Sequence, residues 1–130
     1  MAIPSGSGSE VLKRMSITRQ DTTATKVDWA QAVQTDAGNS SGTTAVPTNK
    51  ILTILSIFLH LDDTGAKNFT IYIEHSGETT IFLFQEEAVP AKGTFVVNDK
   101  IILHPADVLV FDASGARFDI LINFIEQDWT

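Results

Sequence analysis

The stretch ILTILSIFLHL at residues 51–61, with FTIYIEH at residues 69–75 shortly after it, decides the fold class. The first stretch is apolar at most positions, and it lies between Pro47 and the polar turn DDTG at residues 62–65. Such a stretch is typical of a strand buried on both faces. The second alternates apolar and polar residues, which predicts a strand with one face in a core and the other in water.

The alternation assigns individual side chains to faces. In residues 69–75 we expect Phe69, Ile71 and Ile73 to point inward, and Thr70, Tyr72 and Glu74 to point outward. In a last strand over residues 117–126 we expect Phe118, Ile120, Ile122 and Phe124 on one face, with Asp119 and Asn123 on the other. These two stretches therefore predict the two sides of one hydrophobic core.

Other short apolar stretches recur along the chain between turn residues. Strands are predicted over residues 11–19, 22–33, 79–85, 93–97, 100–103 and 108–111. Residues 34–45 form a polar loop, expected at the tip of a hairpin, and residues 86–93 form a connection. Strands at this spacing, without a helical period, indicate an all-β fold: an antiparallel β-sandwich, jelly-roll-like, with an extended N-terminal arm.

The length of 130 residues fits one domain. Residues 1–10, MAIPSGSGSE, combine a proline with small polar residues and glycines, and we expect them to form a flexible arm. Residues 11–130 then form the single sandwich domain.

Charge and composition exclude several partners. The net charge is −7: residues 1–48 balance four basic against four acidic side chains, and residues 49–130 carry five basic and twelve acidic ones. The acidic part of the chain repels phosphate backbones, which argues against nucleic acid as a partner. The neutral N-terminal part could contact an acidic neighbour. The longest apolar run, residues 51–61, is too short for a membrane-spanning helix. The chain has no cysteine, hence no disulfide or thiolate site.

No set of residues has the spacing of a catalytic or metal site. The three histidines, His60, His75 and His104, stand at strand ends or turns, outside any ligand motif. The doublets Asp62-Asp63 and Glu86-Glu87 place neighbouring carboxylates on opposite strand faces, which disfavours a hydrolase. We therefore expect no enzyme activity, no catalytic residues, no cofactor and no metal.

Three aromatic residues have a second interpretation. Trp29, Tyr72 and Trp129 could stack on a sugar ring, with Tyr72 or Trp29 as the exposed platform, although aromatic residues of a sandwich usually belong to its core or to an interface. Trp129 lies next to the C-terminal residue, where a large ring indicates contact with the domain itself or with a neighbouring subunit.

Several segments together resemble a group of small virion proteins of tailed bacteriophages. They are PSGSGSEVLKR (4–14), VPTNKI (46–51), LSI (55–57), VPAKGTF (89–95), VLVF (108–111) and FIEQDWT (124–130). The resemblance covers most of the chain, is weaker over residues 22–45, and brings no functional residues with it. It implies a β-sandwich that decorates or joins parts of a virion after synthesis in the host cytoplasm.

The functional expectation is therefore an oligomeric capsid decoration (cement) or accessory protein. Its partners would be copies of itself, for example in a trimer, and other virion proteins of the capsid, neck or tail. The alternative is a neck- or tail-associated part, or a tail-fibre module that binds host glycans. The residues expected at the assembly interface are Pro4, Ser5, Gly6, Ser7, Gly8, Val11, Leu12 and Trp129.

Overall fold

The computed structural model describes residues 8–18, 24–35, 43–75, 79–113 and 116–129. Within these ranges the chain has ten strands and no helix. The strands are β1 (Ser9–Thr18), β2 (Thr25–Lys26), β3 (Val33–Thr35), β4 (Lys50–Leu61), β5 (Lys67–His75), β6 (Thr79–Val89), β7 (Thr94–Val97), β8 (Ile101–Leu103), β9 (Asp107–Asp112) and β10 (Phe118–Asp128). The prediction of an all-β fold is confirmed.

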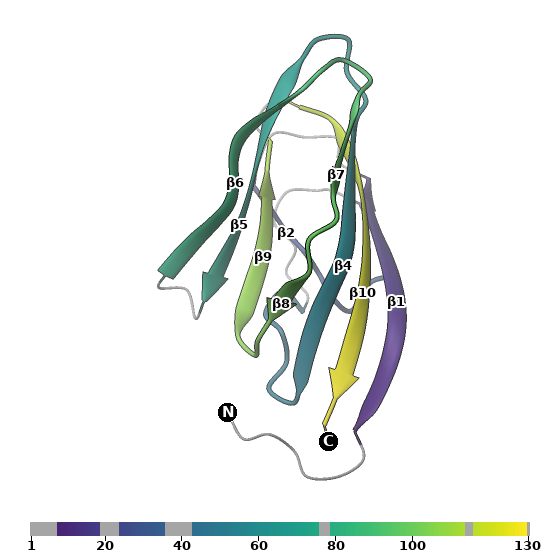
Figure 1. Cartoon of the computed structure of the whole chain (residues 1–130), viewed down its shortest axis with the longest axis vertical. Helices are drawn as coiled ribbons and strands as arrows, with labels where there is room; N and C mark the ends of the chain where they lie inside the picture. Colours follow the sequence, from purple (N-terminus) through teal and green to yellow (C-terminus); the bar gives the residue numbers. More distant parts are fainter. Residues whose placement is uncertain (1–7, 19–23, 36–42, 76–78, 114–115, 130) are drawn as a thin grey trace.

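The strands form two layers that enclose one core, which makes the domain a β-sandwich (Figure 1). Sheet A has the order β3-β1-β10-β4-β7, and β8 also pairs with β4. Sheet B has the order β2-β9-β5-β6. Neighbouring strands are antiparallel apart from β1 and β3, which are parallel.

The central pair of sheet A joins the two stretches with the strongest apolar pattern. Strands β4 and β10 pair over their full lengths, from Leu61 opposite Phe118 to Lys50 opposite Asp128. Every second residue of β10 from Phe118 to Phe124 is buried, as its alternation predicts. These strands are 50 or more residues apart in sequence, so the core is held by long-range pairing.

A cluster of phenylalanine rings joins the two sheets. Phe69 of β5 lies with its ring centroid 5.0 Å from that of Phe95 of β7 and 5.9 Å from that of Phe118 of β10. Phe84 of β6 packs against Phe69 and Phe95 as well, at 6.4 and 5.6 Å. The edge-to-face geometry of the closest pairs is the one that aromatic rings prefer.

The sequence predicts a second strand over residues 22–33, followed by the loop of a hairpin. This prediction is wrong. Strand β2 has two residues and belongs to sheet B, whereas β3 belongs to sheet A. The chain turns between them around the buried Asp28, whose carboxylate accepts hydrogen bonds from the backbone N–H of Ala30 and of Thr43. A buried carboxylate bonded to nearby backbone competes with strand pairing, which the richness in Thr, Val and Ala did not reveal. Residues 36–42 of the expected loop lie outside the described ranges.

Two further expectations require correction. Strand β4 is not buried on both faces, because Phe58 on the outward face is 37% exposed. Strand β6 continues to Val89, through residues expected to form a connection. A β-bulge permits this extension: the register with β5 shifts between Phe69 and Ile71, and Glu86 has a φ of 52°.

Candidate functional site

The histidines lie in two places. His60 lies near Asp62, whereas His75 and His104 both lie at Asp107, which also accepts a hydrogen bond from the His104 backbone N–H at 2.8 Å. His60 contacts Thr94 Oγ1 at 3.1 Å at one end of the sandwich, while His75 contacts Asp107 at the other end. No group of three or more histidine, aspartate or glutamate side chains is placed to hold a metal ion in the described part of the chain.

The most exposed apolar residues of sheet B lie on its edge strand β6. This strand pairs with β5 on one side, and no described strand pairs with its other side (Figure 1). Ile81 and Phe82 are 51% and 53% exposed, and both lie in the apolar half of the strand. An open, apolar edge presents unpaired backbone donors and acceptors, which is a template for another strand.

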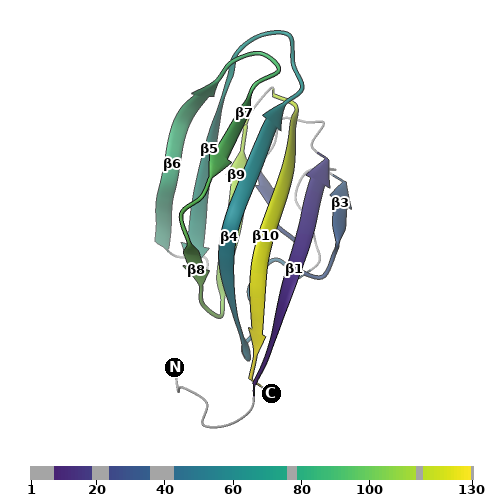
Figure 2. The same cartoon turned by 45° about the vertical axis from the view of Figure 1, so that its right-hand side comes forward.

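A second open edge lies on the opposite side of the sandwich. Strand β1 pairs with β10 along its whole length, whereas β3 pairs with it only at residues 16–18 (Figure 2). On the remaining part, Leu12 is 71% exposed and Val11 is exposed as well. Lys13 is bonded to Glu126 at 3.1 Å, and Arg14 is exposed beside them.

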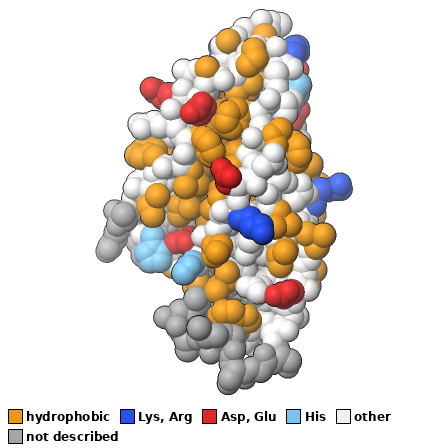
Figure 3. Space-filling view, viewed as in Figure 1, with side chains coloured by type: hydrophobic (Ala, Val, Ile, Leu, Met, Phe, Trp, Pro, Cys, Tyr) orange, Lys and Arg blue, Asp and Glu red, His pale blue; other side chains and the backbone are white. Residues whose placement is uncertain are grey.

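The outer face of sheet A carries two uncharged rows of side chains across its strands. One row runs through Leu12, Ile125, Thr53 and Ile102, and the other through Ser16, Leu121, Phe58 and Val96. Figure 3 shows hydrophobic side chains along the middle of the molecule as seen in Figure 1, where strands of both sheets are in view. Sheet A thus offers apolar surface both on its face and at its edge.

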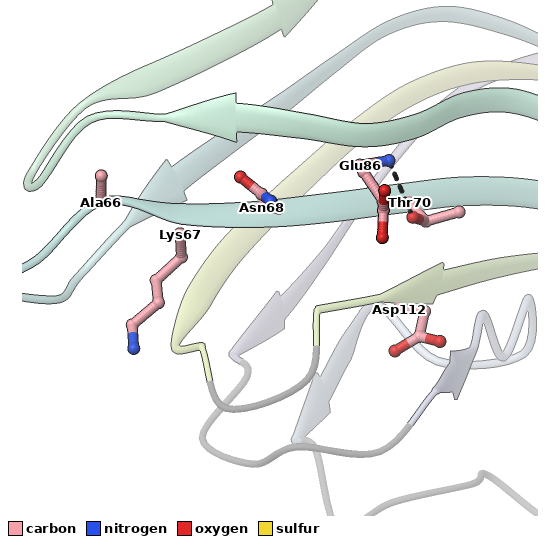
Figure 4. A pocket seen from close by; sticks show the side chains of 6 residues that line it. All are labelled: Ala66, Lys67, Asn68, Thr70, Glu86 and Asp112. Atoms are coloured by element: carbon pink, nitrogen blue, oxygen red, sulfur yellow. Dashed lines mark hydrogen bonds between the residues drawn. The ribbon is translucent and has the colours of Figure 1, made fainter.

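The outer face of sheet B carries instead a polar hollow of about 380 Å³. Its lining comes from β5 and from the neighbouring strands on either side, and consists of Ala66, Lys67, Asn68, Thr70, Glu86 and Asp112 (Figure 4). The bulge sets the position of Glu86, whose backbone N–H donates to Thr70 Oγ1 at 3.1 Å. Carboxylates from β6 and β9 therefore line the same hollow as the amide and hydroxyl of β5.

An aromatic pair stands beside this hollow. Tyr72 points outward two residues after Thr70, and its ring centroid is 5.7 Å from that of Phe82. Partial burial, together with the charges of Glu74 and Asp112, raises the pKa of the Tyr72 phenol above 10.0. Of the two platforms considered from sequence, Tyr72 lies at the surface, whereas Trp29 is 8% exposed and packs edge-on against Phe124.

The structure brings together some of the residues expected at an assembly interface. Gly8 contacts Trp129 so closely that a Cβ on Gly8 would lie 2.7 Å from Trp129 Cδ1. The backbone N–H of Trp129 also donates to Asn49 O at 2.9 Å, so the C-terminal ring lies against its own domain. Val11 and Leu12 lie on the open edge of β1, which begins at Ser9, inside the expected arm. Pro4, Ser5, Gly6 and Ser7 lie outside the described residues.

Sequence reasoning missed the open edge of β6 and the residues of the hollow. The edge had a signal, because Ile81, Phe82, Leu83 and Phe84 are four successive apolar residues in a strand that should alternate. The hollow had none, because Glu86 and Asp112 become neighbours of Thr70 only through the strand order and the bulge.

No protein-family model matches the chain, and no curated protein matches its sequence. In the described part of the chain there is no helix that could cross a membrane.

Proposed function

We propose that this chain is a non-enzymatic structural protein of a tailed-phage particle, which works as a homo-oligomer in a capsid decoration (cement) or accessory role. The observation that carries the proposal is the pair of open apolar strand edges, β1 and β6, on opposite sides of the sandwich (Figure 2). The sequence resemblance to small virion proteins is the reason for proposing that the assembly belongs to a phage particle.

The occupant that fits these edges is a second copy of the chain. The open part of β1 presents Leu12 and Arg14, and the open edge of β6 presents Phe82 followed by Glu86 and Glu87. Apolar residues on both edges, with opposite charges beside them, favour pairing of β1 in one copy with β6 in the next. Pairing of β6 with β6 would instead bring like charges into the same interface.

Head-to-tail pairing has a consequence for assembly. A contact between two different patches of the same molecule closes into a ring if its rotation permits, and otherwise extends as a filament. A trimeric ring is one closed form, and a ring of copies suits a particle with rotational symmetry. A neck or tail position would use the same edges, so the proposal is not limited to the head.

The winding of the sandwich adds support. With β3 set aside and β7 and β8 counted together, the two sheets have the orders β1-β10-β4-β7 and β2-β9-β5-β6. The chain passes from one sheet to the other after each strand except in the β5–β6 hairpin. We interpret this order as a jelly roll, a winding that occurs in viral capsid domains and also in lectins. Because a fold does not determine function, the winding supports the proposal without carrying it.

The first experiment measures the mass of the purified chain by light scattering over a range of concentrations. We expect an oligomer. Leu12→Asp and Phe82→Asp place a charge at an exposed position of each edge, so each should give a smaller species with unchanged circular dichroism. Phe58→Asp, on the outer face of sheet A, is the matched control and should associate as the wild type does.

Mixing the two edge variants tests the direction of pairing. The Leu12→Asp chain keeps an intact β6 edge, and the Phe82→Asp chain keeps an intact β1 edge. Head-to-tail pairing therefore predicts a one-to-one heterodimer that does not grow further. Dimers of Leu12→Asp alone would show β6–β6 pairing, and a monomeric wild type would contradict self-association.

The virion role is tested separately, by electron microscopy of source virions labelled with antibodies against this chain. Label at regular positions on heads, necks or tails is expected. Its absence from every part of the particle would overturn the virion role while leaving the oligomer measurement intact.

A further inference from the structure

We infer that the hollow on the outer face of sheet B is a binding site for a neutral saccharide, with the Tyr72–Phe82 pair as the platform for the sugar ring. This inference does not rest on the virion role. Phe82 and Glu86 belong to the edge strand β6 as well, but the hollow that they border opens on the outer face of the sheet.

The polar lining fits the hydroxyl groups of a sugar. Glu86 and Asp112 can accept hydrogen bonds from hydroxyls, and Asn68 and Thr70 can both donate and accept (Figure 4). Lys67 adds a charged donor. A ligand with many hydroxyls, each able to donate and accept, satisfies such a mixed set without leaving groups unpaired.

The aromatic pair fits the apolar face of the same ligand. Tyr72 follows Thr70 by two residues on the outward face of β5, a separation of about 7 Å along the strand. Phe82 is 53% exposed and lies against Tyr72, so the two rings extend the hollow with an apolar surface. Pyranose rings combine C–H faces with hydroxyl edges, and this site offers an aromatic surface next to a polar hollow in the same way.

Other ligand classes fit less well. An anion would meet the two carboxylates of Glu86 and Asp112. An apolar molecule would meet a lining in which, of the described residues, only Ala66 is apolar. A metal ion lacks a third acidic or histidine ligand among the described residues. A quaternary ammonium could use the rings and the carboxylates, but Lys67 in the lining repels it.

The bulge in β6 positions one wall of the site. The register shift at Glu86 turns its carboxylate toward the hollow, and the bond from its N–H to Thr70 Oγ1 fixes the local backbone. The hollow opens on the outer face of the sheet, whereas strand pairing would use the backbone edge of β6. Both interactions can therefore occur on one molecule.

The test begins with the wild-type chain on an array of neutral, anionic and amino saccharides. Neutral saccharides that bind are then titrated into ¹⁵N-labelled protein, with choline as a cationic probe in parallel. We expect at least one neutral saccharide to bind with a dissociation constant in the millimolar range or below. It should shift the amide signals of Asn68, Thr70 and Asp112 to saturation.

Variants assign the binding to this hollow. Tyr72→Ala and Asp112→Asn should each weaken saccharide binding by about tenfold, equivalent to 1.4 kcal/mol. Tyr72→Phe keeps the ring and should retain most of the affinity. Asp99→Asn removes an exposed carboxylate between two strands of sheet A, and it should bind as the wild type does.

Three outcomes would overturn the inference. They are the absence of binding to every neutral saccharide on the array, saturable shifts with choline alone, and binding that Tyr72→Ala and Asp112→Asn leave unchanged. None of these would affect the oligomer measurement, so the failure of this inference and the failure of the proposed function are distinguishable.

Discussion

The two outer faces of this sandwich differ, although the inner faces beneath them are alike. The outer face of sheet A carries uncharged rows through Phe58 and Ile125. The outer face of sheet B carries the polar hollow and the Tyr72–Phe82 pair. Inward positions of both sheets are mostly apolar because they share one core, and Thr25 and Glu126 are among the buried polar exceptions. The two sheets therefore differ in the outward half of each alternation.

The largest expected effect tests whether the two faces rest on a common core. Phe69→Ala removes a ring that contacts phenylalanines of both sheets, namely Phe84, Phe95 and Phe118. We expect a loss of about 3–5 kcal/mol in the free energy of unfolding, measured by denaturant titration.

Phe58→Ala, on the outer face of sheet A, should cost less than about 1 kcal/mol under the same conditions. If Phe69→Ala instead gave two separate transitions, the sheets would unfold independently, and the comparison of two faces on one core would fail.

A smaller effect concerns the electrostatics of sheet B alone. Tyr72 is the chain's one tyrosine, so the near-ultraviolet absorbance of tyrosinate reports its ionisation directly. Because desolvation, Glu74 and Asp112 hold the pKa of the phenol above 10.0, Asp112→Asn should lower that pKa toward 10.0.

The matched control for that titration is Asp99→Asn, which changes the net charge by the same amount. Asp99 lies between β7 and β8 of sheet A. The substitution should leave the curve unchanged. Equal shifts in the two variants would mean that net charge, rather than the neighbourhood of the hollow, acts on Tyr72.

The smallest effect is expected at the end of the sandwich, away from both faces. A hydrogen bond from Lys92 at 2.7 Å, with its charge and that of Arg117, lowers the pKa of Asp62 below 3.8. A carboxylate whose pKa is lowered in the folded state stabilises the fold at a pH above its pKa in the unfolded state. This contribution is lost as the pH falls through the pKa of the folded state.

Asp62→Asn should therefore lower the melting temperature slightly at pH 7, and the difference should vanish in strong acid. Because the pair is exposed, added salt should reduce the difference at pH 7 as well. A difference that persisted in acid would point to a packing effect of the substitution instead.

The alternation of the sequence predicted the faces of strands but not their partners. Phe69, Ile71 and Ile73 point inward as expected, because a period of two fixes which side chains share a face. Nothing local indicated that β4 would pair with β10, since the sheet order depends on the packing of the whole chain. The turn around Asp28 was missed for a related reason: although Ala30 is close in sequence, the second backbone partner, Thr43, is distant.

The same limit applies to the candidate site. The outward position of Tyr72 followed from its strand pattern, and its use as a platform was considered from sequence. The carboxylates beside it come from two other strands, and one of them depends on a bulge at a non-glycine residue with positive φ. Neither strand order nor such a bulge has a reliable signature in a single sequence.

The close approach of Gly8 to Trp129 has a practical consequence. Strand β1 starts opposite the end of β10, with Ser9 facing Asp128, so both ends of the described chain leave the domain at one pole. In a ring of copies related by rotation, these poles would occupy equivalent positions. A reporter or cargo fused at either end would therefore be displayed at the same place on every copy, away from the opposite pole of each domain.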